Sequence, residues 1–310
     1  IFRLVRFRSA IGSFIYILEL LPRWCYEAEQ ELQDARDRAE RGLGDWSGLA
    51  DLDDESQYGR TYLGADVHRV DLDITVSTHA DQTAIAPGRL LREWVDGERR
   101  LFHYRTDRPV LNFFAVLSGV YAVESVGHND GEIAVYLHPK HDMNVDRMIE
   151  ATRDALDYFG AEFGPYQYQH VRIIEFPRYE TFAQSFANTI PYSEDIGFVA
   201  DLRDASTIDY VYSVTAHELA HQWWGHQIAP ANVQGGTVLS ESLAQYSAYM
   251  LIQHRYGPAY LRRFLKWELD RYLRGRSNET DEEQVLMRTE NKSYIHYQKG
   301  GLILYALQDV

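Results

Sequence analysis

The sequence contains one cysteine, Cys25, and does not begin with methionine. A single cysteine allows no disulfide within the chain, so no redox compartment is indicated. The apolar stretch near the start, Ala10 to Leu21, falls short of the roughly 20 residues that a transmembrane helix needs. We therefore expect no membrane segment in this chain, which as given is expected to be soluble. The missing methionine favours a processed product or a fragment.

Positive charge is also scarce. The chain has 31 Lys and Arg against 46 Asp and Glu, a formal net charge of −15. Such an excess of negative charge does not suit a phosphate backbone, so we expect no nucleic-acid partner. The excess is concentrated between Glu27 and Arg60, where eleven acidic residues stand against four basic ones. We interpret this stretch as an irregular, solvated surface segment with a short helix over 27–41 and a loop over 42–59.

What the sequence does have is enough apolar material for a packed core. Its 310 residues are 45% hydrophobic and 25% charged, which is typical of a globular protein and excludes a disordered one. The length suggests about two domains.

The first domain is predicted to be rich in β-structure. Residues 67–76 alternate polar and apolar side chains with period two, which indicates a half-buried strand. Further strand-like runs are 99–105, 111–117, 120–126 and 132–137.

After Pro139 the pattern becomes mainly helical. Asn144 is expected to cap a helix that reaches Phe159, a strand covers 171–176, and long helices follow from Tyr210 onward. The sequence therefore predicts an α+β fold, with a β-rich domain over 1–140 and a mainly helical domain over 141–310.

A His-Glu-x-x-His pattern lies in one of these helices, at His217, Glu218 and His221. Residues four apart share a helix face, so the two imidazoles can bind one ion. Glu218 is adjacent and can reach a water molecule on that ion without binding the ion itself. This arrangement suits a zinc hydrolase, in which the ion lowers the pKa of bound water to about 7 and a glutamate takes its proton.

A catalytic zinc ion normally has a third protein ligand. Between Glu218 and Glu268 the only acidic residue is Glu241, at the start of another predicted helix. His226 is the alternative ligand. The three-histidine pattern His-x-x-Gly-x-x-His is not met, because Trp224 occupies the glycine position, so we interpret His226 as structural.

The run from His217 to Gly225, together with Ser240 to Ala244, resembles the aminopeptidase-N-like family of zinc peptidases, the gluzincins. More narrowly, it is similar to bacterial members that can be fused to a permease-like membrane region. The resemblance implies a thermolysin-like catalytic domain over 141–310, one zinc ion, a peptide substrate and aminopeptidase activity. The C-terminal helical domain of the family is absent from the sequence, so we expect the catalytic domain to be truncated at Val310.

The resemblance also implies two further site residues. Glu194 falls on the glutamate that grips the free amino group of the substrate, although Asp195 replaces the asparagine of that motif. Tyr297 matches the family's Tyr-x-Lys-Gly segment, whose tyrosine stabilises the oxyanion. Tyr294 is the alternative.

One spacing departs from the family. Nineteen residues separate His221 from Glu241 instead of eighteen, and Gly235-Gly236 is expected to absorb the extra residue.

Three functions stay open at this point. The first is a zinc aminopeptidase. The second is an endopeptidase or epoxide hydrolase of the same family. The third is a non-catalytic peptide-binding domain of a transporter-linked protein.

Overall fold

The computed structural model describes residues 12–16, 32, 35–46, 48–64, 67–204, 206–279, 282–290 and 292–309. Cys25 and residues 27–31, 33 and 34 of the helix predicted over 27–41 lie outside the described residues. The described part of that segment forms α2 (Ala35–Glu40). The apolar stretch 10–21 contains β1 (Gly12–Tyr16). In the described part of the chain, none of the helices combines the length and the apolar character that crossing a bilayer requires.

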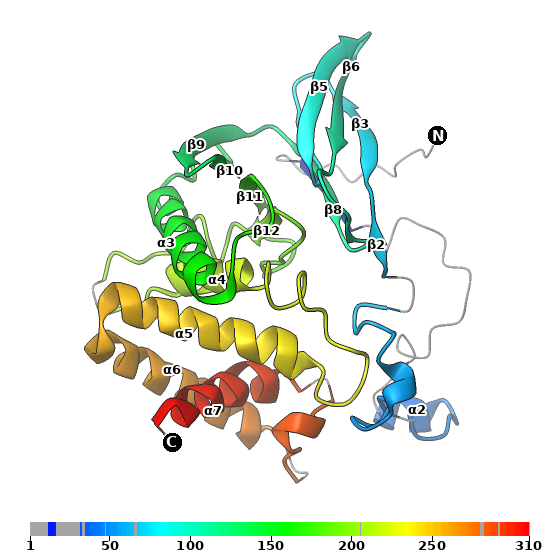
Figure 1. Cartoon of the computed structure of the whole chain (residues 1–310), viewed down its shortest axis with the longest axis vertical. Coiled ribbons are helices and arrows are strands. Elements are labelled where there is room, and N and C mark those ends of the chain that lie inside the picture. Colours follow the sequence, from blue (N-terminus) through cyan, green and yellow to red (C-terminus); the bar gives the residue numbers. More distant parts are fainter. Residues whose placement is uncertain are drawn as a thin grey trace.

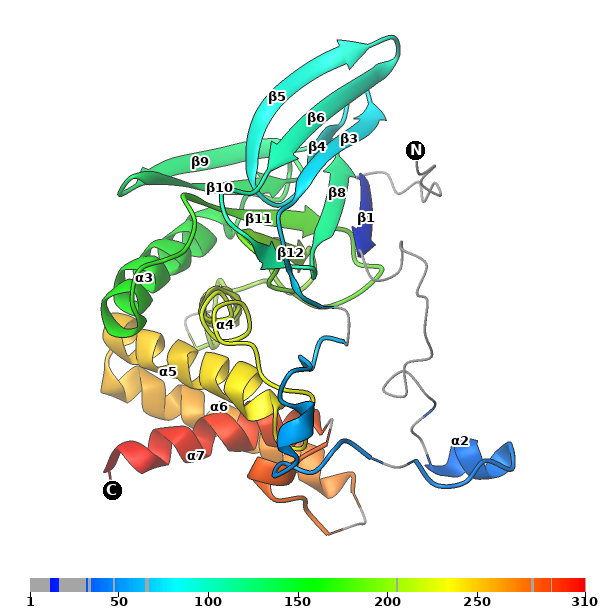
Figure 2. The same cartoon turned by 45° about the vertical axis from the view of Figure 1, so that its right-hand side comes forward.

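The first part of the chain is built from short antiparallel sheets (Figure 1). One three-stranded sheet has the order β3-β6-β5 and another the order β1-β8-β4, while β2 pairs with β7. Their strands are β2 (Arg69–Val70), β3 (Asp73–His79), β4 (Thr83–Ile85), β5 (Arg89–Asp96), β6 (Arg99–Arg105), β7 (Val110–Leu111) and β8 (Ala115–Gly119). The hairpin of β5 and β6 projects away from the helices in both views (Figures 1 and 2).

A mixed four-stranded sheet with the order β12-β11-β10-β9 connects this part to the helices. Strand β10 pairs antiparallel with β9 and parallel with β11, which pairs parallel with β12. The strands are β9 (Ala122–His128), β10 (Gly131–Leu137), β11 (His170–Phe176) and β12 (Thr189–Ser193). The sheet uses strands from both sides of residue 140. The boundary near 140 stays a prediction.

The helices pack below this sheet, and α4 lies between the sheet and α5 (Figure 2). The long helices are α3 (Val145–Phe163), α4 (Tyr210–Ala220), α5 (Leu243–Tyr256), α6 (Pro258–Ser277) and α7 (Gly300–Ala306). Two π-helical turns, η3 (Val238–Ser242) and η5 (Ile295–Lys299), precede α5 and α7. Single 3₁₀ turns are η2 (Glu55–Gln57), η4 (Leu286–Arg288) and η6 (Leu307–Asp309). The largest hydrophobic core fills the space between the sheet and α3 to α6.

The α+β fold is confirmed, and three local predictions need correction. The strand predicted over 67–76 is divided, because residues 71 and 72 lie outside β2 and β3, which belong to different sheets. The strand predicted over 111–117 is interrupted, because residues 112–114 leave the sheet between β7 and β8. Asn144 stands at the start of α3, but its side chain does not cap the helix. Its amide instead donates to the carbonyls of Gly197 and Ala200, at 2.8 and 2.9 Å. Asn144 therefore holds the loop after β12 against α3.

Candidate active site

Helix α4 carries the first two candidate ligands in a buried position. Its start is capped by Asp209, whose carboxylate accepts a hydrogen bond of 3.0 Å from the Tyr212 backbone N–H. Arg147 of α3 donates to the other oxygen of Asp209 at 2.7 Å. Nine of the eleven residues of α4 are buried, so the helix is fixed between the sheet and its neighbours. His217 and His221 project from its C-terminal end.

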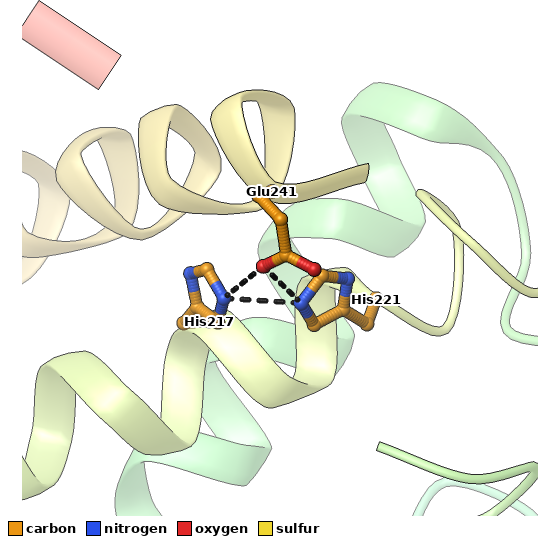
Figure 3. Close-up of side chains that lie close together, drawn as sticks. All are labelled: His217, His221 and Glu241. Carbon is orange, nitrogen blue, oxygen red and sulfur yellow. Dashed lines mark hydrogen bonds and ion pairs between the residues drawn. The ribbon is translucent and has the colours of Figure 1, made fainter. Parts of the chain in front are cut away.

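Three side chains converge there from two helical segments (Figure 3). Nε2 of His217 lies 3.0 Å from Nε2 of His221. Oε2 of Glu241 lies 3.4 Å from the first nitrogen and 3.3 Å from the second. All three side chains are nearly buried, with exposed fractions between 9 and 15%.

This spacing fits a tetrahedral zinc ion. Ligands about 2.0–2.1 Å from zinc at tetrahedral angles lie roughly 3.3 Å apart, and two imidazoles with one carboxylate form a known catalytic set. The charges fit as well. Burial alone would raise the pKa of Glu241, but His221 and His217 hold it well below its ordinary value. Burial would lower the pKa of His221, whereas Glu241 raises it to about 9. The carboxylate therefore favours a positive charge between the three groups.

The ring of His221 is oriented by a backbone carbonyl. Its Nδ1 lies 2.9 Å from the Trp224 carbonyl oxygen. This bond assigns a proton to Nδ1, so Nε2, which faces His217 and Glu241, is the nitrogen available to a metal ion.

Glu241 lies in the π turn η3 rather than in a regular α-helix. A π turn contains one more residue than an α turn, so it offers a place for the additional residue between His221 and Glu241. The glycines expected to absorb it lie in tightly packed backbone. A Cβ on Gly235 would collide with the Met287 carbonyl, and one on Gly236 would lie 2.5 Å from the Ala231 carbonyl oxygen.

Glu218 is next to the ligands and buried, with an exposed fraction of 6%. Burial raises the pKa of Glu218 to about 7, although the positive charge of His221 acts to lower it. Among the described residues, its Oε2 has no hydrogen-bond partner. An unpartnered carboxylate oxygen with a pKa near neutrality is suited to receive a proton from water.

Tyr297 lies beside the same group, with its ring centroid 5.6 Å from that of His217. Burial raises its pKa well above the ordinary value and Glu241 adds to this effect, so the phenol keeps its proton and can donate it. Gly300 makes this placement possible, because a Cβ there would collide with the side chain of Ser242 beside Glu241. Tyr294, the alternative, donates instead to Glu279 at 2.7 Å.

Glu194 does not join this group. Its Oε1 accepts a hydrogen bond of 3.0 Å from the Arg178 backbone, and its Oε2 lies 3.7 Å from Nδ1 of His141. That histidine lies 2.5 Å from an oxygen of Glu175. We call His141, Glu175 and Glu194 the second cluster. The predicted amine-gripping residue therefore has its contacts at a different place.

His226 also stays apart from the ligand group. Its Nε2 lies 3.1 Å from the Ser185 carbonyl oxygen, and burial lowers its pKa to about 4. This contact agrees with the structural role assigned to it.

A small cavity beside His221 and Glu241 shows residues that the sequence analysis missed. It is lined by Tyr62, Leu63, Phe113, Gln184, Ser185, His221, Gly225, His226 and Glu241. The sequence carries no motif that marks Tyr62 or Gln184.

Tyr62 lies two residues after the acidic segment 27–60, which was expected to be only a solvated surface. In the structure, residues 48–64 run along the loop between α4 and η3, close to the start of α5 (Figure 2). Backbone hydrogen bonds join Gln234 to Ala50 at 2.8 Å and Asn232 to Arg60 at 2.9 Å. The end of the acidic segment thus lies beside the loop that leads to Glu241, and the residues directly after it line the cavity.

Comparisons with known proteins agree with this geometry. Residues 147–310, more than half of the chain, match the Peptidase family M1 domain. "Probable aminopeptidase 1" of Saccharolobus solfataricus is 24% identical over 218 residues, covering 68% of this chain and 27% of the relative. "Probable aminopeptidase 1" of Sulfurisphaera tokodaii is 25% identical over 179 residues, covering 57% and 22%. The chain therefore spans about a quarter of the length of these curated relatives.

The fold has solved counterparts. The crystal structure of an M1 zinc metallopeptidase from Deinococcus radiodurans superimposes with a TM-score of 0.59 at 18% sequence identity. The match covers 78% of this chain and 53% of the other. At this identity the likeness shows a shared fold.

Proposed function

Because the chain belongs to peptidase family M1, we propose that it hydrolyses peptide bonds as a zinc-dependent peptidase. One observation carries the proposal. Three ligand atoms at tetrahedral spacing are surrounded by a buried carboxylate of raised pKa and a protonated phenol. This combination provides a metal site, a base and an oxyanion donor within one buried group.

The residues divide the chemistry among them. His217, His221 and Glu241 would hold the zinc ion, which when bound activates water and polarises the substrate carbonyl. Glu218 takes the proton of the attacking water and later passes it to the leaving amine. The Tyr297 phenol donates a hydrogen bond to the oxygen on which negative charge develops.

Two specificities are candidates for this chemistry. The names of the two relatives support an aminopeptidase, which removes N-terminal residues. The position of Glu194 in the second cluster favours cleavage that does not depend on the N-terminus. The retained base, ligand set and phenol argue against a purely peptide-binding role.

The test is hydrolysis of a panel of aminoacyl-arylamides and quenched fluorescent peptides by the purified chain, with zinc measured on the same sample. We expect about one zinc ion per chain and activity that a chelator removes. Glu218→Gln is nearly isosteric and should lower kcat by about 10²–10⁴-fold while zinc stays bound. Full activity in a zinc-loaded Glu218→Gln variant would exclude the proposed mechanism.

A further inference from the structure

We propose that the substrate cleft accepts peptides without a free α-amino group, so that N-blocked peptides and internal peptide bonds are cut as readily as N-terminal ones. The inference rests on the proposed zinc peptidase function and specifies its substrate class. It is carried by the charges of the residues that line the cavity beside the ligands.

Recognition of a free N-terminus requires a particular group. An α-ammonium loses its hydration when it enters a buried site, and this loss is offset only by a carboxylate or a similar acceptor at hydrogen-bond distance. A cleft that selects free N-termini must therefore present an acidic side chain that is not already occupied by another cation.

The cavity beside His221 and Glu241 presents no such group among its described lining residues. Glu241 is its one acidic residue, and that carboxylate faces the two imidazoles at 3.3 and 3.4 Å. The other nearby polar side chains are neutral, namely Tyr62, Gln184 and Ser185, and Leu63 and Phe113 are apolar. Neutral and apolar walls beside the ligands offer no counter-charge to an α-ammonium group.

Glu218 is adjacent to the ligands and has an oxygen without a partner among the described residues, but the proposed function assigns it to the attacking water. Other acidic side chains of the same region are engaged elsewhere. Glu194 binds the Arg178 backbone in the second cluster. Glu290 accepts a hydrogen bond of 2.7 Å from Gln234. Asp51 and Asp53 pair with Arg288, at 2.9 and 2.8 Å. Each of these carboxylates therefore already has a hydrogen-bond or ion-pair partner.

Gln184 is the position at which this neutrality can be reversed. Its backbone N–H donates to the Pro191 carbonyl at 3.1 Å, which holds residues 182–186 against β12. Its half-buried side chain lines the cavity, and the one hydrogen bond that it donates is a long one, 3.5 Å to the Ser185 carbonyl. Gln184→Glu keeps the shape of the side chain and adds the missing negative charge.

The experiment compares pairs of quenched fluorescent peptides that differ only by an N-terminal acetyl group, with cleavage sites located by mass spectrometry. For the zinc-loaded parent chain we expect kcat/KM values for the free and acetylated peptides within about threefold of each other, and cuts at internal bonds. For Gln184→Glu we expect the ratio of kcat/KM for the free peptide to kcat/KM for the acetylated peptide to rise by about ten- to a hundredfold. This is the range that one charge-assisted hydrogen bond supplies.

Gln227→Glu is the matched control. It makes the same chemical change at an exposed residue close in sequence to the site but outside the cavity lining, and should leave the ratio unchanged. A parent chain that releases single residues from free peptides and spares acetylated ones would overturn the inference and leave the zinc peptidase function intact. Absence of hydrolysis of every peptide by the zinc-loaded chain would instead reject the proposed function itself.

Discussion

The two clusters of histidine and glutamate in this chain have similar compositions and opposite properties. Each brings three potential metal ligands within 4.8 Å of one another. In the second cluster, Glu175 is fully buried, and its two oxygens are already matched by His141 and by the His138 backbone N–H, each at 2.5 Å. Glu194 has the Arg178 backbone as a donor. The second cluster is therefore satisfied by its own hydrogen bonds.

The polar atoms in and around the cluster of His217, His221 and Glu241 are not all matched by hydrogen bonds in this way. Its three ligand atoms face one another, and the adjacent Glu218 has an oxygen without a hydrogen-bond partner among the described residues. Buried polar atoms without partners are costly, and they persist where a ligand completes them. The residue types of a cluster thus do not distinguish a metal site from an ion pair. The hydrogen-bond partners of each polar atom in the cluster do.

The largest expected difference between the clusters is in zinc binding. Glu241→Gln removes a ligand and should abolish hydrolysis, with a loss of zinc affinity greater than the roughly 10–100-fold that removal of an outer-shell partner costs. Glu194→Gln should keep zinc at the parent level. Zinc titration and activity assays on both variants test this pair. Loss of zinc from Glu194→Gln would show that the second cluster binds metal.

The next effect concerns the phenols. Tyr297→Phe should lower kcat by about 10²–10³-fold with little change in KM, because it removes a hydrogen bond that forms fully only in the transition state. Tyr294→Phe removes a bond to Glu279 away from the ligands and should change kcat very little. Steady-state kinetics on the two variants decide between them, and equal losses would contradict the assignment of Tyr297.

A smaller effect is expected in the pH dependence of stability. Burial raises the pKa of Glu175 above its ordinary value near 4.5, although His141 and the His138 backbone oppose it. A carboxyl group whose pKa is raised by folding stabilises the protein below its unfolded pKa and loses this contribution as the pH rises through the folded value. Relative to the parent, Glu175→Gln should therefore gain stability between pH 4 and pH 7.

Thermal unfolding of both proteins across this range measures the difference, which should amount to a few degrees. The same comparison for Glu98→Gln serves as a control, because that side chain is exposed at the turn between β5 and β6, outside the second cluster. A constant gap between the parent and Glu175→Gln at all pH values would contradict the raised pKa.

The smallest effect is expected where the acidic segment meets the catalytic part. Arg288→Gln breaks two ion pairs, with Asp51 and Asp53, that lie at the surface and are worth about 0–1 kcal/mol. Because this contact helps to hold Tyr62 at the cavity, we expect a rise in KM of up to about fivefold at unchanged kcat. Arg203→Gln, which breaks another exposed ion pair, with Asp201, should leave KM unchanged.

The residues that could be predicted from sequence are those with short-range signals. His217, Glu218 and His221 follow from helical periodicity, and Tyr297 from a local motif. The contact of residues 48–64 with the loop before Glu241 could not be predicted, because it joins segments about 180 positions apart through backbone hydrogen bonds that carry no residue signature. Glu194 matched a motif at one acidic position, but the sequence does not show which partner an acid will bind.

The two π turns have a consequence for how such a site can change. Glu241 and Tyr297 each occupy a turn that is one residue wider than an α turn, directly ahead of a regular helix. Removing one residue from such a turn would rotate what precedes it by about 100° relative to the following helix. The number of residues in each turn therefore determines the direction in which Glu241 and Tyr297 point. An insertion or a deletion there can redirect an active-site side chain, as a substitution can.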